Sequence, residues 1–263
     1  MRRNQTHNLT GAQPPSAATE ESAHVENEAA TDAETERIRA AYARRRAIPP
    51  GRYAVTDPFT LYSSHEREQE MAALFRAEGL VSLAGLRILD VGCGRGDTLR
   101  RFLEYGADPV LVAGIDLLED RLNLARYRAP HLPVICGSAT RLPFQDHSFD
   151  MVLQFTLFTS ILSNEVKRAA AAEMARVLAP GGRILWYDFS YNNPKNPDVR
   201  GIGRREIQAL FPGFKMKIRR ITLAPPLGRV IAPVSVVLYY LLSRVRPLCT
   251  HYLCLLQKPR PCP

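Results

Sequence analysis

A glycine-rich stretch at residues 89–96 has the residue types and spacing of a cofactor-binding turn. It reads Leu-Asp-Val-Gly-Cys-Gly-Arg-Gly, so Gly92, Gly94 and Gly96 form a G-x-G-x-G pattern. A short apolar segment precedes it as a predicted strand, and an amphipathic segment follows it as a predicted helix. This order builds a cofactor crevice at the carboxyl end of a parallel sheet. A dinucleotide fingerprint would have its third glycine one place later, at Asp97, so the pattern favours a cofactor without a pyrophosphate.

A second residue able to contact a cofactor is Asp116, which directly follows an apolar run and lies 20 residues past Gly96. A carboxylate at the end of a second strand can accept hydrogen bonds from both hydroxyls of a ribose. Such a group suits any adenosine cofactor. By itself it does not separate NAD from S-adenosylmethionine.

The elements that must position these residues alternate along the chain. We expect strands at 87–91, 110–116, 132–136, 149–154 and 183–189, and helices at 65–78, 97–105, 119–128 and 165–178. Short buried strands that alternate with helices predict an α/β fold with a parallel sheet and helices on both faces. After these we expect a short helix at 204–210, a half-exposed strand at 215–223, an apolar run at 230–242 and a last strand at 251–256.

The N-terminal residues are polar and acidic, with almost no large apolar side chains, which predicts a disordered tail over 1–36. A charged helix is expected over 33–46. No secretory signal is recognisable, because polar residues follow the first arginines. The five cysteines form no C-x-x-C pair, which predicts a reduced, cytoplasmic setting and argues against a zinc site. We expect no metal. Cys93 is interpreted as a small core residue rather than a nucleophile.

The formal net charge of +9 comes from the end of the chain. Residues 200–263 contain twelve Lys or Arg and one acid, Glu206, a local balance of +11. This excess indicates a local anionic partner, such as a phosphate-bearing substrate or a membrane surface. A solvated basic face without a partner is the alternative. No recognised RNA-binding motif accompanies the charge, so we do not expect a nucleic acid partner.

The apolar run at 230–242 is flanked by Arg229, Arg244 and Arg246. It is too short to span a bilayer, which needs roughly 20 such residues. Two interpretations remain open at this point: the segment 229–246 makes peripheral contact with a membrane, or it packs on the domain.

A third motif, Gly-Ser-Ala-Thr-Arg-Leu-Pro-Phe at 137–144, is followed by Ser-Phe-Asp at 148–150. With it the chain resembles the class I S-adenosylmethionine-dependent methyltransferases, in particular the UbiE-like, methyltransferase-11 type. Four motifs in the family's order carry the resemblance, at 89–96, 114–117, 139–152 and 177–182. It implies a Rossmann-like, seven-stranded mixed sheet with an antiparallel last strand, and S-adenosylmethionine as the cofactor.

The resemblance also implies the residues of the cofactor site. They are Asp90, Gly92, Cys93, Gly94, Gly96, Asp116, Leu117, Ser138, Ala139 and Gln154. The family often has an acid or asparagine in the adenine loop where this chain has Ser138. A hydroxyl can still accept the hydrogen bond of the adenine amino group, so we expect altered affinity rather than lost binding.

On the acceptor side, the resemblance implies a pocket built from an N-terminal helix and the loops after the fourth and fifth strands. The residues expected to bind substrate there are Tyr62, Phe155, Tyr187, Asn192 and Asn193. Asp188 is the candidate general base or substrate-orienting group, and His65 is the second candidate, since histidine transfers protons near neutral pH. A structural hydrogen bond or a solvated position is the alternative for both.

These observations predict four regions: a tail at 1–36, a helical cap at 37–84, a cofactor-binding core at 85–190, and substrate-side loops, a basic, apolar insertion and the last strands at 191–263. The expected reaction is in-line methyl transfer to an oxygen of a small-molecule, sugar or lipid-linked acceptor. C-methylation of a quinone or lipid is the alternative. The rivals are an NAD-dependent oxidoreductase and a non-catalytic membrane-surface or nucleic-acid-binding module on the same fold.

Overall fold

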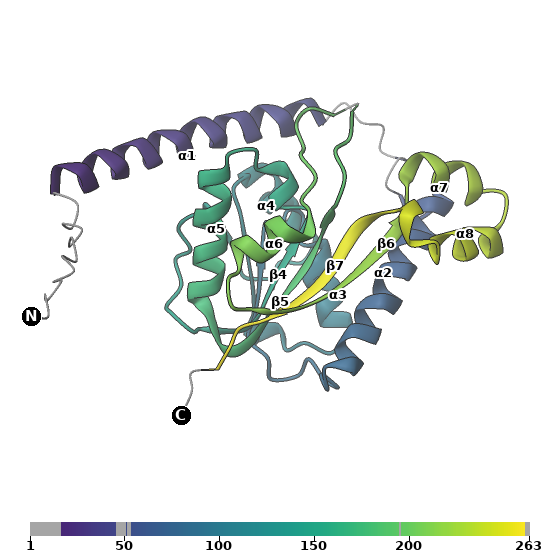
Figure 1. The fold of residues 1–263 in the computed structure, drawn as a ribbon. Helices are drawn as coiled ribbons and strands as arrows, with labels where there is room; N and C mark the ends of the chain where they lie inside the picture. The colour runs from purple at the N-terminus through teal and green to yellow at the C-terminus, as the bar shows by residue number, and fades with distance from the viewer. Residues whose placement is uncertain (1–16, 46–50, 52–53, 195, 261–263) are drawn as a thin grey trace, which may run out of the picture.

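One seven-stranded sheet, in the order β3-β2-β1-β4-β5-β7-β6, organises the chain in a computed structural model (Figure 1). The structure describes residues 17–45, 51, 54–194 and 196–260, with side chains from residue 31 onward. The strands are β1 (Ile88–Val91), β2 (Val112–Asp116), β3 (Val134–Cys136), β4 (Phe149–Phe155), β5 (Leu178–Phe189), β6 (Lys215–Leu223) and β7 (Cys249–Gln257).

The helices lie between the strands, except for two that precede the sheet. They are α1 (Ala17–Arg45), α2 (Pro58–Ala77), α3 (Asp97–Glu104), α4 (Glu119–Arg128), α5 (Asn164–Val177), α6 (Arg204–Leu210), α7 (Pro225–Ile231) and α8 (Val236–Ser243). Single 3-10 turns are η2 (Pro109–Leu111), η3 (Phe158–Ser160) and η4 (Arg246–Leu248).

The sheet is mixed. Strands β1 to β5 pair in parallel, whereas β7 runs antiparallel to both β5 and β6. The predicted seven-stranded sheet with an antiparallel last strand is therefore confirmed. Because the parallel strands share one direction, their carboxyl ends meet at one edge, where the chain turns of β1, β2 and β4 lie together.

Two apolar cores lie on opposite faces of the sheet. Leu74 of α2, Phe102 of α3 and Leu122 of α4 are buried in one core. Met174 of α5 and Ile207 of α6 are buried in the other core, and the second half of α1 also packs on this face. The predicted cover of helices on both faces is confirmed (Figure 1).

The prediction of a disordered N-terminal tail over residues 1–36 is wrong for residues 17–36. Residues 17–36 form the first part of α1, while residues 1–16 lie outside the described residues. Alanine and glutamate, which dominate the segment, are strong helix formers even where apolar residues are scarce. The following turns supply the packing, because Ala41 is buried and Ile38 packs against the core beside α5.

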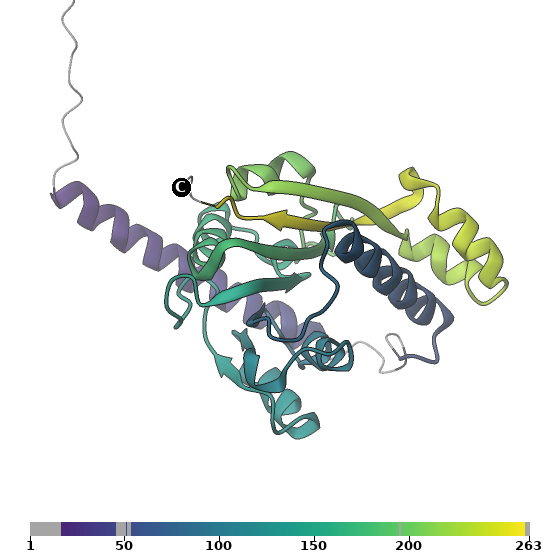
Figure 2. The same cartoon turned by 90° about the horizontal axis from the view of Figure 1, so that it is seen from below.

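The apolar run near the end of the chain is a pair of short helices, α7 and α8, with the turn around Pro233 between them. We call residues 225–243 the hairpin. Figure 2 shows it projecting from one end of the sheet beside α2. Its inner side packs on the domain: Tyr239 is fully buried, and Phe59 of α2 lies against Gly228.

The outer edge of the sheet on this side is β6, which the sequence predicted as a half-exposed strand. Lys215 and Lys217 are exposed, whereas Met216 and Ile218 between and after them are partly buried. The alternation is that of a strand with one face on the core and one in water. It confirms the prediction for this segment.

The close contact at Gly228 predicts a stability effect. A Cβ at this position would lie 2.3 Å from Cε2 of Phe59. Gly228→Ala should therefore lower the free energy of unfolding by about 1–3 kcal/mol, the usual cost of overpacking, although alanine favours helices. Gly203→Ala is the matched control, because a Cβ there meets nothing within 4 Å. Equal urea midpoints for the two variants would contradict the packing argument.

Candidate active site

The glycine turn after β1 is fixed to the end of β2 by backbone hydrogen bonds. The N–H groups of Gly92 and Cys93 both donate to the carbonyl of Ile115, at 2.8 and 3.0 Å. Gly94 adopts a φ of +56°, and a Cβ there would lie 2.2 Å from Nη2 of Arg121. Only glycine fits this position without displacing Arg121.

Asp116, at the end of β2, completes the turn with its side chain. Its Oδ2 accepts from the N–H of Gly94 at 2.8 Å, and its Oδ1 accepts from the N–H of Leu118 at 2.9 Å. Each carboxylate oxygen keeps a second lone pair for a further donor. The group is therefore held in place and keeps free lone pairs, which suits the predicted contact with two hydroxyls of a ribose.

Asp90 lies behind the turn with its side chain almost completely buried. Neither carboxylate oxygen has a hydrogen-bond partner among the described residues. Burial and the negative charge of Asp116 together raise the pKa of Asp90 to about 8. An unpartnered buried carboxylate next to a second one is costly, and a positively charged ligand would offset that cost.

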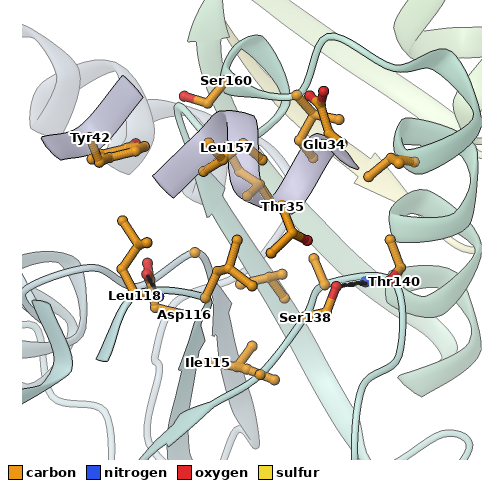
Figure 3. A pocket seen from close by; sticks show the side chains of 18 of the residues that line it. Glu34, Thr35, Tyr42, Ile115, Asp116, Leu118, Ser138, Thr140, Leu157 and Ser160 are labelled. Carbon is orange, nitrogen blue, oxygen red and sulfur yellow. Dashed lines mark hydrogen bonds between the residues drawn. The ribbon is translucent and has the colours of Figure 1, made fainter. Parts of the chain in front are cut away.

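A pocket opens beside these residues and encloses about 790 Å³ of free space, counting its mouth. Figure 3 shows Asp116 and Ser138 on one side of it and side chains of α1 on the facing side. The lining includes backbone turns after β1, β2, β3 and β4, so it lies where the fold brings the strand ends together.

Helix α1 covers the pocket with Glu34, Thr35 and Tyr42 (Figure 3). Two side chains of α1 bind the segment that follows β4. The Glu34 carboxylate accepts a hydrogen bond from the N–H of Leu162, and the Arg37 guanidinium donates one to the carbonyl of Ser160. On the other side of the mouth, the Arg121 guanidinium lies 4.8 Å from the centre of the Tyr42 ring.

Thr156, directly after β4, lines the same pocket with a φ of +59°. A β-branched residue rarely adopts this left-handed conformation. Its N–H donates to the carbonyl of Tyr187 at 2.8 Å, and its hydroxyl donates to the carbonyl of Phe155 at 2.7 Å. These bonds hold the strained turn, and such strain is concentrated at functional sites.

The structure brings most of the predicted cofactor residues together. Those that line the pocket are Gly92, Asp116, Leu117, Ser138 and Ala139. Asp90, Gly94, Gly96 and Gln154 lie in or behind the same turns. Gln154 is fully buried, and its Oε1 accepts from the N–H of Leu157 at 3.2 Å. Its Nε2 has no partner within the described residues, so it is a second buried polar atom without a bond.

Cys93 has the position of a core residue. Its thiol is buried beneath the turn and packs against Gly114, where an added Cβ would lie 2.8 Å from Sγ. Burial raises the pKa of the thiol. A protonated, enclosed thiol is a poor nucleophile. Cys136, Cys249 and Cys254 are also free thiols, and Cys262 lies outside the described residues.

The two predicted catalytic residues lie away from this pocket. Asp188 is buried and accepts from the hydroxyl and N–H of Thr159, at 2.5 and 3.2 Å, and from the N–H of Phe189 at 2.9 Å. Burial raises its pKa to about 7. His65 is exposed on α2. Neither is among the pocket-lining side chains in the described part of the chain, and the bonds of Asp188 are those of a structural group that holds η3.

The predicted substrate residues are spread over three places. Phe155 lines the pocket, and its ring centre lies 5.8 Å from that of buried Tyr187. Tyr62 packs instead against the hairpin. Asn192 closes its own loop, because its Oδ1 accepts from the N–H of Gly201 at 2.9 Å, and Asn193 belongs to the same loop.

Arg67 of α2 was not predicted and lies over the aromatic pair. Its guanidinium carbon is 5.1 Å from the centre of the Tyr187 ring and 5.8 Å from that of Phe155. Tyr187 also stacks on His251, with ring centres 4.8 Å apart. The Phe155, Tyr187, His251 and Arg67 side chains form what we call the aromatic cluster. It continues from the pocket toward α2.

The contribution of α1 was also missed. The signal was present in the expected helix at 33–46, where Ile38, Ala41 and Tyr42 recur at helical spacing. Within the described residues, His, Cys, Asp and Glu side chains do not gather into a group that could hold a metal ion.

Comparison with known proteins agrees with this geometry. Residues 88–182 match a family model described as a methyltransferase domain. Over 110 residues the chain is 34% identical to a demethylmenaquinone methyltransferase of Renibacterium salmoninarum, covering 42% of this chain and 44% of that protein. Over 167 residues it is 31% identical to phthiotriol/phenolphthiotriol dimycocerosates methyltransferase 1 of Mycobacterium ulcerans, covering 57% and 58%.

Among solved structures, phosphoethanolamine N-methyltransferase 2 of Haemonchus contortus in complex with S-adenosylmethionine is similar in fold. The TM-score is 0.54 at 19% identity, covering 73% of this chain and 53% of that one. The chain spans about half the length of the curated relatives it matches. Residues 88–182 thus match a methyltransferase domain, and the chain has the class I methyltransferase fold that the motifs implied.

The residues present fit this cofactor. S-adenosylmethionine has a ribose and carries positive charge on its sulfonium and its amino group. Asp116 offers free lone pairs for ribose hydroxyls, and Asp90 is a buried carboxylate without a partner among the described residues. The site thus combines a ribose acceptor in the pocket wall with a buried carboxyl group whose ionisation a cationic ligand favours.

The raised pKa of Asp90 predicts pH-dependent cofactor binding. Below pH 8 the free protein holds Asp90 mostly protonated, and a cationic ligand favours the ionised form. Affinity for S-adenosylmethionine should therefore rise between pH 6 and 8 and level off above about 8, with a proton released on binding at the lower pH. Calorimetric titration across this range measures both quantities.

Asp90→Asn should weaken binding about tenfold or more, because an uncharged amide cannot stabilise the cation, and it should remove the pH dependence. Adenosine serves as the control ligand, because it lacks the positive charges and should bind both proteins with little pH dependence. An unchanged pH profile in the variant would contradict the assignment to Asp90.

Proposed function

We propose that the protein transfers a methyl group from S-adenosylmethionine to a phenolic, lipid-like acceptor. The observation that carries the proposal is the pocket lined by Asp116, with the unpartnered Asp90 buried behind its glycine turn and Phe155 of the aromatic cluster in its wall. Both curated relatives described above are named for acceptors with large apolar parts. The names of these relatives favour a lipid-linked acceptor over the sugar acceptor that the sequence analysis also allowed.

The groups near the strand ends favour a phenol over an aliphatic alcohol. An aliphatic hydroxyl needs a strong base to become a nucleophile. Asp188 already accepts three hydrogen bonds and does not line the pocket, and burial lowers the pKa of His251 to about 3, so its neutral ring is a weak base. A phenol ionises near pH 10, and a cation beside it lowers that value. Arg67 is such a cation.

Bound S-adenosylmethionine supplies an electrophilic methyl group on its sulfonium. The chain's own part is to align the acceptor with that methyl group, to hold the acceptor oxygen ionised and to exclude water. Positioning alone is worth about 7–11 kcal/mol at best. Phe155 lines the pocket and offers an apolar face for the acceptor ring, and Arg67 lies 5.8 Å from the centre of the Phe155 ring to stabilise the developing phenolate.

Oxygen is the acceptor atom that we propose. A phenolate is also nucleophilic at its ortho carbons, so the same arrangement suits C-methylation of a quinol ring, the second candidate. The relative named for demethylmenaquinone favours this second reaction. Asp188 is proposed here as a positioning residue that holds η3 beside the pocket, and His65 has no role in the reaction.

The first experiment separates this function from its rivals. S-adenosylmethionine and NAD are titrated into the wild-type protein and into Asp116→Asn, with circular dichroism melts as the control for folding. We expect micromolar binding of S-adenosylmethionine, no binding of NAD, and roughly tenfold weaker binding in the variant, because the amide nitrogen cannot accept the hydrogen bonds of the lost oxygen. NAD binding in place of S-adenosylmethionine would refute the proposal.

Activity is then tested with a prenylated 1,4-naphthohydroquinone as the probe. Formation of S-adenosylhomocysteine reports turnover, and proton NMR of the product distinguishes a methoxy group from a ring methyl group. A long-chain aliphatic alcohol is the matched acceptor without a phenol. Turnover of the alcohol but not of the hydroquinone would contradict the phenolic class.

Arg67 provides the sharpest mechanistic prediction. Arg67→Met should lower kcat/KM for the probe at pH 7 by about 10²–10³-fold, the usual cost of removing one electrostatic stabiliser. The defect should shrink as the pH approaches 10, because the phenol then ionises without help. Arg67→Lys should restore part of the rate at pH 7.

Arg76→Met is the control on the same helix, because Arg76 is exposed. Both methionine variants should bind S-adenosylmethionine as the wild type does. A loss in Arg67→Met that is equally large at pH 7 and pH 10 would assign Arg67 a structural role.

A further inference from the structure

The hairpin exposes an unusual amount of apolar surface. Seven large apolar residues in and next to it are more than a third exposed: Val230, Val234, Val236, Val237, Leu238, Leu241 and Val245. Val234, at the turn, is 79% exposed, and Leu241 on α8 is 63% exposed. Single exposed apolar residues need no explanation, but so many within one short segment indicate a contact surface.

This exposure does not come from a loosely attached segment. The inner side of the hairpin is fixed by Tyr239, whose hydroxyl donates to the buried Glu66 carboxylate at 3.2 Å. The ring centres of Tyr239 and Tyr62 are 5.6 Å apart, and Gly228 lets Phe59 approach the helix backbone. The hairpin is therefore held in place on the domain through one apolar side, while a second apolar side is exposed to solvent.

The charged side chains of the hairpin and of the turn after it are all positive. Residues 225–248 contain three arginines, Arg229, Arg244 and Arg246, and no acidic residue. Arg244 is 68% exposed, with its closest carboxylate contact at 3.7 Å, and Arg246 is also exposed. Arg229 pairs with Asp57 at the start of α2. Exposed cations beside exposed apolar side chains complement the anionic head groups and acyl chains of a bilayer surface.

We propose that the hairpin docks the protein on an anionic lipid bilayer, with its exposed valines and leucines in the interface and Arg244 and Arg246 among the head groups. This inference builds on the proposed lipid-like acceptor and gives it a route to the site. In the described part of the chain, the helices fall short of the length and apolar composition that crossing a bilayer requires. The contact is thus one that lies in the membrane surface.

The hairpin is well placed for this role. It packs on α2 through Phe59 and Tyr62, and the same helix carries Arg67 of the aromatic cluster. Figures 1 and 2 both show it at one end of the molecule, beyond the sheet. Docking through its outer side would hold the acceptor side of α2 at the membrane, where a lipid-like acceptor is concentrated.

The test is sedimentation of the full chain with vesicles, without any methyl donor or acceptor. Binding is expected with vesicles of phosphatidylcholine containing phosphatidylglycerol, and it should weaken as the salt concentration rises. Vesicles of phosphatidylcholine alone should retain clearly less protein. Because no turnover is measured, failure here is separate from failure of the proposed methyl transfer.

Two matched pairs of variants locate the contact. Val237→Glu with Leu241→Glu should weaken binding to anionic vesicles about tenfold or more, because carboxylates oppose both burial and charge attraction. Val81→Glu with Val110→Glu is the control, since both valines are more than 80% exposed but precede β1 and β2, in the half of the sheet away from β6 and β7. This pair should bind as the wild type does.

The double variant Arg244→Gln, Arg246→Gln should make vesicle binding less dependent on salt concentration. The control variant Arg204→Gln, Arg205→Gln on α6 should leave that dependence unchanged. If the Val81→Glu, Val110→Glu control lost as much vesicle binding as the Val237→Glu, Leu241→Glu variant, a contact through the hairpin would be refuted. Failure to bind anionic vesicles at low salt by a protein that still binds S-adenosylmethionine would also refute it. A third outcome would assign this face to a second copy of the chain. In it the wild type does not bind vesicles but forms a dimer in sedimentation velocity, and the Val237→Glu, Leu241→Glu variant is a monomer.

Discussion

The arrangement of the site depends on one carboxylate, that of Asp116. By accepting the N–H groups of Gly94 and Leu118 it joins the turn after β1 to the turn after β2 and leaves lone pairs facing the pocket. The pKa of Asp90 nearby is raised by burial, and the negative charge of Asp116 adds to that effect. A single side chain therefore shapes the turn, offers acceptors to a ribose and helps to keep a second carboxyl group protonated until a cation binds. Parallel pairing of β1 and β2 makes this possible, because it brings both strand ends to one edge.

The acceptor side is built on a different physical basis. Around the cofactor turns, hydrogen bonds and left-handed glycines set the geometry, whereas Phe155, Tyr187 and His251 are positioned by ring packing across three strands. Polar groups that are fully bonded, such as Asp188 with Thr159, hold the loops in place rather than face the pocket. This division explains why a strained residue such as Thr156 is found where the two parts meet.

The sequence predicted those features that depend on local pattern. Apolar runs and glycine positions located the strands within a few residues, and the motif order implied the strand topology and the turns around Asp116. The role of α1 could not be derived in the same way, because an Ala- and Glu-rich segment has the same composition in a tail as in a helix that packs on α5. Asp188 was misleading since its place at a strand end does not reveal which face its side chain takes. Arg67 gave no local signal, because its partners are distant in sequence.

The basic residues at the end of the chain have a further consequence at β6. An edge strand leaves one row of backbone N–H and C=O groups open to any other strand that meets it. Lys215 and Lys217 are exposed along this edge, and two such edges brought together would oppose like charges while desolvating them. Part of the positive charge that suggests an anionic partner therefore resists aggregation, and keeps the open edge of the sheet from pairing with the same edge of a neighbouring molecule.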